Sequence, residues 1–199
     1  MRSPILLRFR GTAAISAAAV LLLSGLCLAA DFTADMVTEF GKTTIPGKLY
    51  VSGANWRQEA SINGKQQIII ARGKSVYIMD PASKQYATKE SSDNPWSASS
   101  MTRVLSGGMN KKSGGKQRVN GIVCDKYVYT SRDGKPGTIT QYAAKELDLS
   151  VRVEMKSEKG TLSIDFKNIK KGPSPASLFQ LPKGYKKVSA SPAQPKKGK

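Results

Sequence analysis

Residues 151–167, VRVEMKSEKGTLSIDFK, decide how this chain folds. Apolar and polar residues alternate through 151–156 and again through 162–167, and a Lys-Gly pair at 159–160 separates the two runs. A period of two places successive side chains on opposite faces of a strand, so each run predicts a strand with one apolar face. The short connection predicts that the two strands pair as an antiparallel hairpin.

The same alternation extends over most of the chain between Phe32 and Ile169. Turn residues interrupt it at short intervals. The Asn63-Gly64 pair is a strong signal for a two-residue hairpin, because both positions tolerate positive φ. The pattern predicts a meander of short antiparallel strands, in which Phe32–Phe40 is compatible with either a strand or a helix.

One helix is expected within this meander. Pro95 suits a first turn, the stretch from Trp96 to Leu105 carries apolar residues on one side, and Gly107-Gly108 marks the end. Residues 107–118, GGMNKKSGGKQR, are rich in glycine, lysine and serine, and they predict a mobile basic loop.

The fold class that follows is mainly β: a single curled antiparallel sheet or unclosed β-barrel, with one or two short helices as a lid. A large sheet with one apolar face must be covered, and curling is the economical solution when only one helix is available. A curved sheet leaves room for an apolar ligand, and an interior filled by its own side chains is the alternative. The residues expected to line the cavity are Trp56, Ile68, Ile70, Tyr77, Met79, Trp96, Met101, Val153, Met155 and Phe166.

The N-terminus has the pattern of a secretory signal peptide. A basic start precedes an uncharged run that is rich in alanine and leucine and ends in small residues. We expect cleavage near Ala29 or Ala30, which makes residues 1–30 the signal peptide. Retention as a membrane anchor and lipidation at Cys27 are the alternatives.

Export would leave one domain over residues 31–187 and a lysine- and proline-rich tail over 188–199, which we expect to be disordered. Cys124 would then be the one remaining cysteine, so the domain would have no internal disulfide. Its apolar neighbours predict a buried thiol in a strand.

Four stretches resemble a known family: 77–81 (YIMDP), 119–127 (VNGIVCDKY), 168–172 (NIKKG) and 177–185 (SLFQLPKGY). The family consists of bacterial envelope domains of unknown function within the LolA/LolB-like superfamily of lipoprotein carriers. The resemblance covers nearly all of the chain after the leader. It implies an unclosed antiparallel β-barrel with helices at its mouth and an apolar cavity for acyl chains. Relatives in that superfamily ferry lipoproteins, bind glycolipids or sense envelope stress.

The absence of histidine from the 199 residues removes Ser-His-Asp and Cys-His nucleophiles and imidazole acid–base chemistry. The carboxylates are scattered without the spacing of a calcium loop, and no phosphate-binding glycine motif occurs. We therefore expect a protein that is not an enzyme and has no catalytic residues, no cofactor and no metal.

Basic residues outnumber acidic ones by 32 to 14. Lys111, Lys112, Lys116 and Arg118 form a cluster that is expected to meet an anionic headgroup or a partner, and a solvated surface is the alternative. An exported chain is not expected to bind nucleic acid specifically.

These observations predict a periplasmic binding protein that holds a lipid or acyl chain on the concave face of its sheet. Its partners would be a lipid or a lipidated protein and an anionic membrane surface, and the protein would be a monomer. The alternative function is an envelope interaction or stress-sensing scaffold with a filled interior, which docks through its lysine-rich loop and tail.

Overall fold

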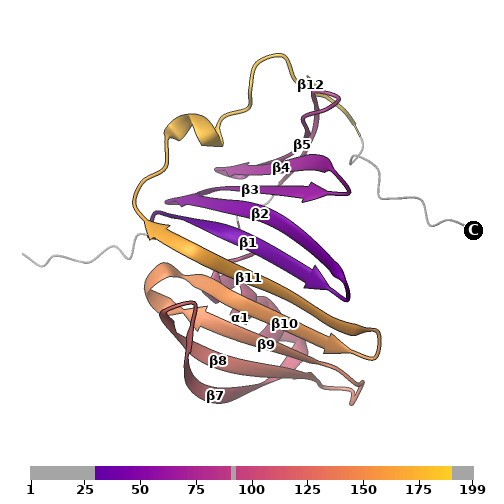
Figure 1. Ribbon diagram of the computed structural model, residues 1–199, viewed down its shortest axis with the longest axis vertical. Helices are drawn as coiled ribbons and strands as arrows, with labels where there is room; N and C mark the ends of the chain where they lie inside the picture. Colours follow the sequence, from indigo (N-terminus) through magenta and orange to yellow (C-terminus); the bar gives the residue numbers. More distant parts are fainter. Residues whose placement is uncertain (1–29, 91–92, 190–199) are drawn as a thin grey trace, which may run out of the picture.

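The computed structural model, which describes residues 30–90 and 93–189, contains one large sheet whose two edges do not meet (Figure 1). Its strands are β1 (Phe32–Phe40), β2 (Thr43–Ser52), β3 (Asn55–Ile62), β4 (Lys65–Arg72), β5 (Ser75–Asp80), β6 (Gln85–Glu90), β7 (Met109–Val119), β8 (Ile122–Ser131), β9 (Thr138–Ala144), β10 (Leu149–Ser157), β11 (Gly160–Lys171) and β12 (Lys186–Lys187). The helix α1 (Ala98–Gly108) and the 3-10 turns η1 (Lys145–Leu147) and η2 (Ala176–Phe179) complete the fold.

The sheet consists of two antiparallel meanders joined along one seam. Strands β1 to β6 form the first meander and β7 to β11 the second, in the order β12-β6-β5-β4-β3-β2-β1-β11-β10-β9-β8-β7. At the seam β1 pairs with β11, and Met36 lies opposite Phe166. The mainly β, curled and unclosed sheet predicted from the alternation is confirmed. Phe32–Phe40, which the pattern left open, is a strand.

The basic stretch 107–118 is not a mobile loop, and that prediction was wrong. Its first two residues end α1, and the rest belongs to β7, which pairs with β8 at one edge of the sheet. A bulge between Ser113 and Lys116 accommodates the two glycines, and Gly115 has φ +77°. Lysines and bulges are common on edge strands because they discourage pairing with other chains, and together with the two glycines of this bulge they give the strand the composition of a loop.

The helix begins later than its sequence signals indicate. Ser97 is the N-cap, and its hydroxyl accepts from the amide of Ser100. Asn94, which precedes the Pro95 expected in the first turn, forms a local turn in which its side-chain oxygen accepts from the amide of Trp96. Trp96 therefore lies in the segment that leads into α1 and not on the helix.

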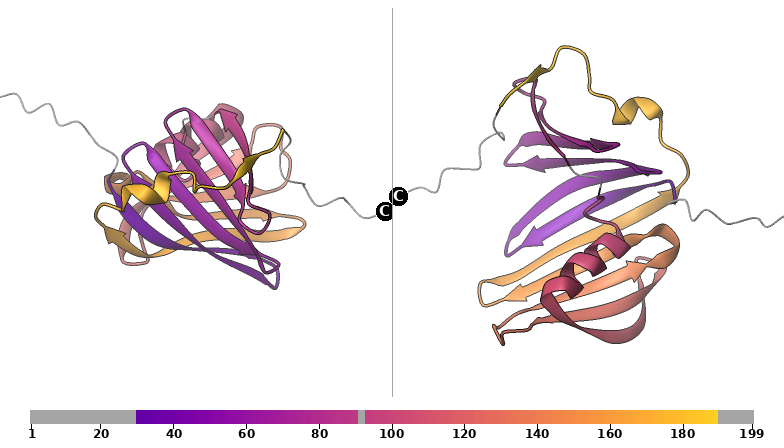
Figure 2. Two further views of the ribbon diagram at one scale, coloured as in Figure 1. Left: turned by 90° about the horizontal axis from the view of Figure 1, so that it is seen from above. Right: turned by 180° about the vertical axis from the view of Figure 1, so that it is seen from behind.

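The two faces of the sheet are covered by different parts of the chain (Figure 2). We call the face that carries α1 the helix face, and the second meander curves around α1 on this side. We call residues 172–188 the strap and the face that they cross the strap face. The strap packs Phe179 against Ile68, Ile70 and Met79, and its Leu178 carbonyl accepts from Arg57.

The leader, residues 1–29, and most of the tail, residues 190–199, lie outside the described residues. Val188, at the start of the predicted tail, still donates its amide to the carbonyl of Tyr86. Within the described ranges, no helix has the length and apolar character needed to cross a bilayer.

Candidate ligand-binding face

A buried glutamine fixes α1 on the helix face. Gln141 of β9 is fully buried and donates to the Ala98 carbonyl and the Ser150 hydroxyl, at 3.0 Å each. Its side-chain oxygen accepts from Thr102, at 3.0 Å, and from Tyr129, at 2.8 Å. The side-chain amide of Gln141 thus makes four hydrogen bonds, and two of its partners, Ala98 and Thr102, belong to α1. Since Ala98 is the one residue of α1 that is fully buried, polar contacts contribute much of what holds this helix on the sheet.

The N-terminus of α1 is held by a second polar group, Asp148, which follows η1. Its carboxylate accepts from the Ser97 hydroxyl at 2.5 Å and from the Ser99 amide and hydroxyl at 2.8 and 2.9 Å. A carboxylate at this end of a helix satisfies free amides and complements the helix dipole.

Trp96 crosses the helix face and closes its centre. Its indole nitrogen donates to Gln58 of β3 at 3.0 Å, and its ring packs edge-on against Phe166, with centroids 5.6 Å apart. The backbone carbonyl of Trp96 also accepts from Ser150 of β10. The middle of the helix face is therefore filled by the protein's own atoms.

The structure divides the ten predicted cavity residues between the two faces. Trp56, Trp96, Met101, Val153, Met155 and Phe166 lie on the helix face or in the elements that cover it. Ile68, Ile70, Tyr77 and Met79 pair with one another across β4 and β5 and lie on the strap face, where they belong to the cluster around Phe179. No single cavity contains all ten, and the ligand role of the six helix-face residues stays a prediction.

One apolar feature of the helix face was not predicted. Across neighbouring strands, Ile139 lies opposite Met155, Met155 opposite Leu162, and Leu162 opposite Phe40. We call these four residues the apolar row. It lies toward the strand ends beyond the area covered by Trp96, and Phe40 remains 49% exposed. The alternation in the sequence could have indicated this row, because all four residues are at positions whose side chains point to the helix face.

Two further isoleucines extend the apolar row onto β2 and β3. Ile45 lies opposite Thr38, on the same face as Phe40, and Ile62, two residues beyond the Ala60–Gly47 pair, is 41% exposed. Exposed apolar side chains that gather on one face indicate an interaction site more than isolated ones do.

The four predicted headgroup cations all lie on β7, but they do not share one face. Lys111, Lys116 and Arg118 lie opposite Tyr129, Asp125 and Val123, which occupy one side of β8. Lys112 lies opposite Val128 and therefore points to the other side. The cluster that is compact in the sequence is split by the pleat of the strand.

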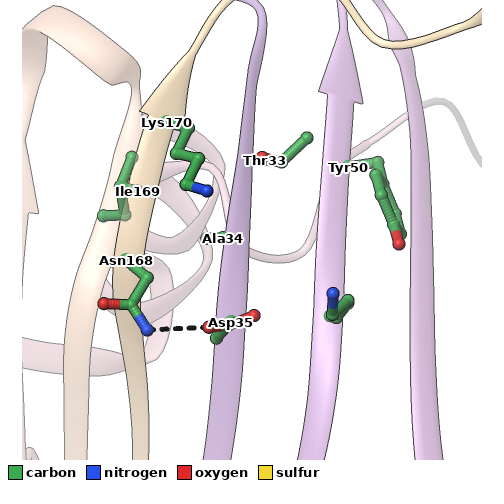
Figure 3. A pocket seen from close by; sticks show the side chains of 8 residues that line it. Thr33, Ala34, Asp35, Tyr50, Asn168, Ile169 and Lys170 are labelled. Atoms are coloured by element: carbon green, nitrogen blue, oxygen red, sulfur yellow. Dashed lines mark hydrogen bonds between the residues drawn. The ribbon is translucent and has the colours of Figure 1, made fainter.

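The largest pocket described, about 510 Å³, lies on the strap side of the seam and has both polar and apolar lining residues. Figure 3 shows Asn168 of β11 beside Asp35 of β1, with the Asn168 amide donating to Asp35 at 2.8 Å, while Lys170 lies opposite Thr33. Asn168 has φ +50°, at the β1–β11 bulge.

Of the ten predicted residues, only Trp56 lines any of the four pockets described. That pocket is small, about 180 Å³, and lies between β1–β3 and the start of α1. The indole nitrogen of Trp56 has no acceptor among the described residues.

A fourth pocket, about 400 Å³, lies between α1 and the β7 edge, and we call it the helix-edge pocket. Its lining comprises Ala98, Ser99, Thr102, Arg103, Lys111, Tyr127, Ala143, Lys145 and Asp148. Three cations from three different elements therefore meet at one opening.

Cys124 is buried, as its neighbours predicted, and burial raises the pKa of its thiol to about 11. Such a thiol stays protonated at neutral pH and is a poor nucleophile. No group of three or more histidine, cysteine, aspartate or glutamate side chains that could hold a metal occurs among the described residues.

Comparisons with solved structures identify proteins with a similar architecture. An uncharacterized conserved protein from Thermus thermophilus has a TM-score of 0.60 at 16% identity, covering 82% of this chain and 93% of that one. MucB, in the complex of Pseudomonas aeruginosa MucA and MucB, has a TM-score of 0.55 at 16% identity, covering 77% of this chain. This chain spans only 56% of that MucB chain. A LolA superfamily protein from Nitrosomonas europaea also matches, with a TM-score of 0.40 at 10% identity, covering 76% and 90% of the two chains.

No protein-family model matches the chain, and no curated protein matches its sequence. At identities this low, the likeness to solved structures is one of fold. The unclosed curled sheet with a helix on one face is the fold class that the sequence predicted, and that prediction is confirmed.

Proposed function

We propose that the protein is an exported, non-enzymatic binding protein that holds an acyl chain or another apolar group on its helix face. The observation that carries this proposal is the apolar row, because it leaves Phe40 half exposed on the face that the sheet curls around. Covering such side chains with an acyl chain gains about 25 cal/mol for each Å² of apolar surface removed from water.

Apolar side chains of the helix α1 support the same proposal. Met101 and Leu105 are half-buried, and Val104 is 69% exposed. At 100° per residue, Met101 and Leu105 lie about 160° around α1 from Arg103, and Val104 lies about 100° from it, so none of the three shares the side of Arg103. An acyl chain on the apolar row would therefore meet apolar side chains of both the sheet and the helix.

Two variants test the acyl-chain site. Phe40→Ser and Leu162→Ser, made together, remove two neighbouring members of the apolar row and should abolish the binding of a fluorescent fatty-acid probe. Val123→Ser is the matched control, because Val123 is 51% exposed on β8 but is not in the row.

Native mass spectrometry of protein purified from an envelope fraction provides the independent measurement. A co-purifying lipid that is lost from the double variant supports the proposal. Absence of lipid, together with no probe uptake by the wild type, rejects it.

A second candidate function is an envelope scaffold that docks through β7. The specific observation is that β7 is an edge strand of eleven residues, almost entirely exposed, with four cations and no acidic residue. The solved complex of MucB with MucA, a protein partner, supports this alternative only by likeness of fold.

Deleting residues 107–118 would be a poor test of docking, because it would remove the end of α1 and nearly all of β7. Replacing the four β7 cations by glutamine keeps the strand. If this variant loses a crosslinked partner that a chain ending at Val188 retains, the result would favour docking through β7 over docking through the tail.

A further inference from the structure

The helix-edge pocket has the composition of a site for an amphiphilic anion. Its floor consists of the small residues Ala98, Ser99 and Ala143, which leave space between α1 and β9. Its walls include the ring of Tyr127 and the aliphatic stems of its lysines and arginine, which offer apolar contact below their charged ends. A volume of about 400 Å³ is within the range of small-ligand sites.

The three cations of the pocket have different local partners. The ammonium of Lys111 lies 3.7 Å from the Tyr127 ring centroid, and no carboxylate of the described residues pairs with it. Arg103 pairs with Asp93 at 2.7 Å, and both side chains are more than half exposed. An anionic ligand would compete only with a solvent-screened pair at Arg103 and with a cation–π contact at Lys111.

Lys145 contributes the third positive charge of the pocket. It pairs with Asp125 at 2.8 Å, and this contact raises the pKa of Lys145 and lowers that of Asp125. Its side chain remains largely exposed, so the ammonium can still reach a ligand.

The one carboxylate in the pocket lining, Asp148, is already engaged. It accepts three hydrogen bonds from Ser97 and Ser99 at the start of α1. Its charge is directed at the helix N-terminus, so the opening of the pocket is dominated by cations.

We propose that the helix-edge pocket binds a phosphate group that gives a net negative charge to a molecule with a small apolar body, as in an anionic phospholipid headgroup or a phosphorylated metabolite. Arg103, Lys111 and Lys145 hold the phosphate, and Tyr127, Ala98 and Ala143 contact the apolar part. This site shares no residue with the apolar row, so it can exist whether or not the row holds an acyl chain.

The pleat of β7 supplies a matched pair of variants. Lys111→Gln and Lys112→Gln remove the same charge from adjacent residues of one strand, but only Lys111 lines the pocket. The probes are short-chain phosphatidylglycerol, short-chain phosphatidylcholine and inorganic phosphate. Binding is measured by calorimetry and by shifts in the NMR signals of the Ala98 and Ala143 methyl groups.

We expect the phosphatidylglycerol probe to bind, Lys111→Gln to weaken it about tenfold, and Lys112→Gln to change it less than twofold. Ala143→Val, which fills the floor, should weaken binding without changing charge. Binding of the lipid probe alone identifies a headgroup, and equal binding of inorganic phosphate identifies a free phosphate as the source.

Equal losses in the two lysine variants would overturn the proposal, because diffuse surface charge would then explain the binding. So would equal affinity for phosphatidylglycerol and phosphatidylcholine, or no binding of any probe. An intact apolar row in these variants is checked with the fatty-acid probe, so failure of this site and failure of the acyl-chain site are distinguishable.

Discussion

Replacing Gln141 by leucine should release α1 from the sheet. The leucine side chain fits a buried site of similar size but cannot make any of the four hydrogen bonds of the glutamine. Two of these bonds run to Ala98 and Thr102 of the helix. The other two join Ser150 and Tyr129 within the sheet.

The expected cost follows from these contacts. Each lost hydrogen bond is worth about 1 kcal/mol, which gives about 4 kcal/mol in total. Burial of the more apolar side chain returns about 1 to 2 kcal/mol. The free energy of unfolding should therefore fall by about 2 to 3 kcal/mol, a large part of the stability of an ordinary domain.

Urea unfolding measures the total loss, and hydrogen exchange locates it. Because only Ala98 of the helix is buried, the amides of α1 should lose protection while those of the β1–β2 hairpin keep it. Gln117→Leu, the same substitution at an exposed site on β7, is the control and should change stability by less than about 0.5 kcal/mol. An equally small change in Gln141→Leu, with α1 exchange unaltered, would refute the view that polar contacts hold the helix.

Three further predictions concern other parts of the molecule. The raised pKa of Cys124 means that the folded thiol keeps its proton to higher pH than the unfolded one. The free energy of unfolding should therefore fall between pH 9 and pH 11, by up to about 2 kcal/mol. Cys124→Ala should lack this component when its urea-unfolding profile against pH is subtracted from that of the wild type. Phe179→Ala should cost about 3 kcal/mol and expose the strap to trypsin, and digestion at the wild-type rate would contradict its role as an anchor. Asp148→Asn keeps the left-handed backbone but removes the negative charge at the start of α1. The thermal midpoint of unfolding should therefore fall by an amount equivalent to about 1 kcal/mol. An unchanged midpoint would argue against a contribution from the helix dipole.

The strands could be predicted because their alternation is a direct consequence of the pleat. The hairpin at Asn63-Gly64 is an example, since both residues have the positive φ that the pair was expected to adopt. Which face each side chain occupies was harder to predict. Residues 68–70 and 76–79 are apolar on both sides, so local sequence could not show which of them point toward α1.

The missing information lies in the strap, about a hundred residues further along the chain. Its Phe179 and Leu178 cover the second apolar face, and this long-range packing makes Ile70 and Met79 core residues on the side away from α1. The β7 edge was missed for a different reason: glycine and lysine favour loops, and pairing with β8 overrides that preference.

The pairing of β1 with β11 has a consequence for how the molecule forms. Phe40 and Leu162, like Phe32 and Lys171, meet across more than a hundred residues of intervening chain. Contacts this distant in sequence make folding slow, and the central seam cannot close before β11 has been synthesised. A growing chain of this connectivity cannot complete the sheet before β11 appears, and an incompletely folded polypeptide can still be threaded through a narrow channel.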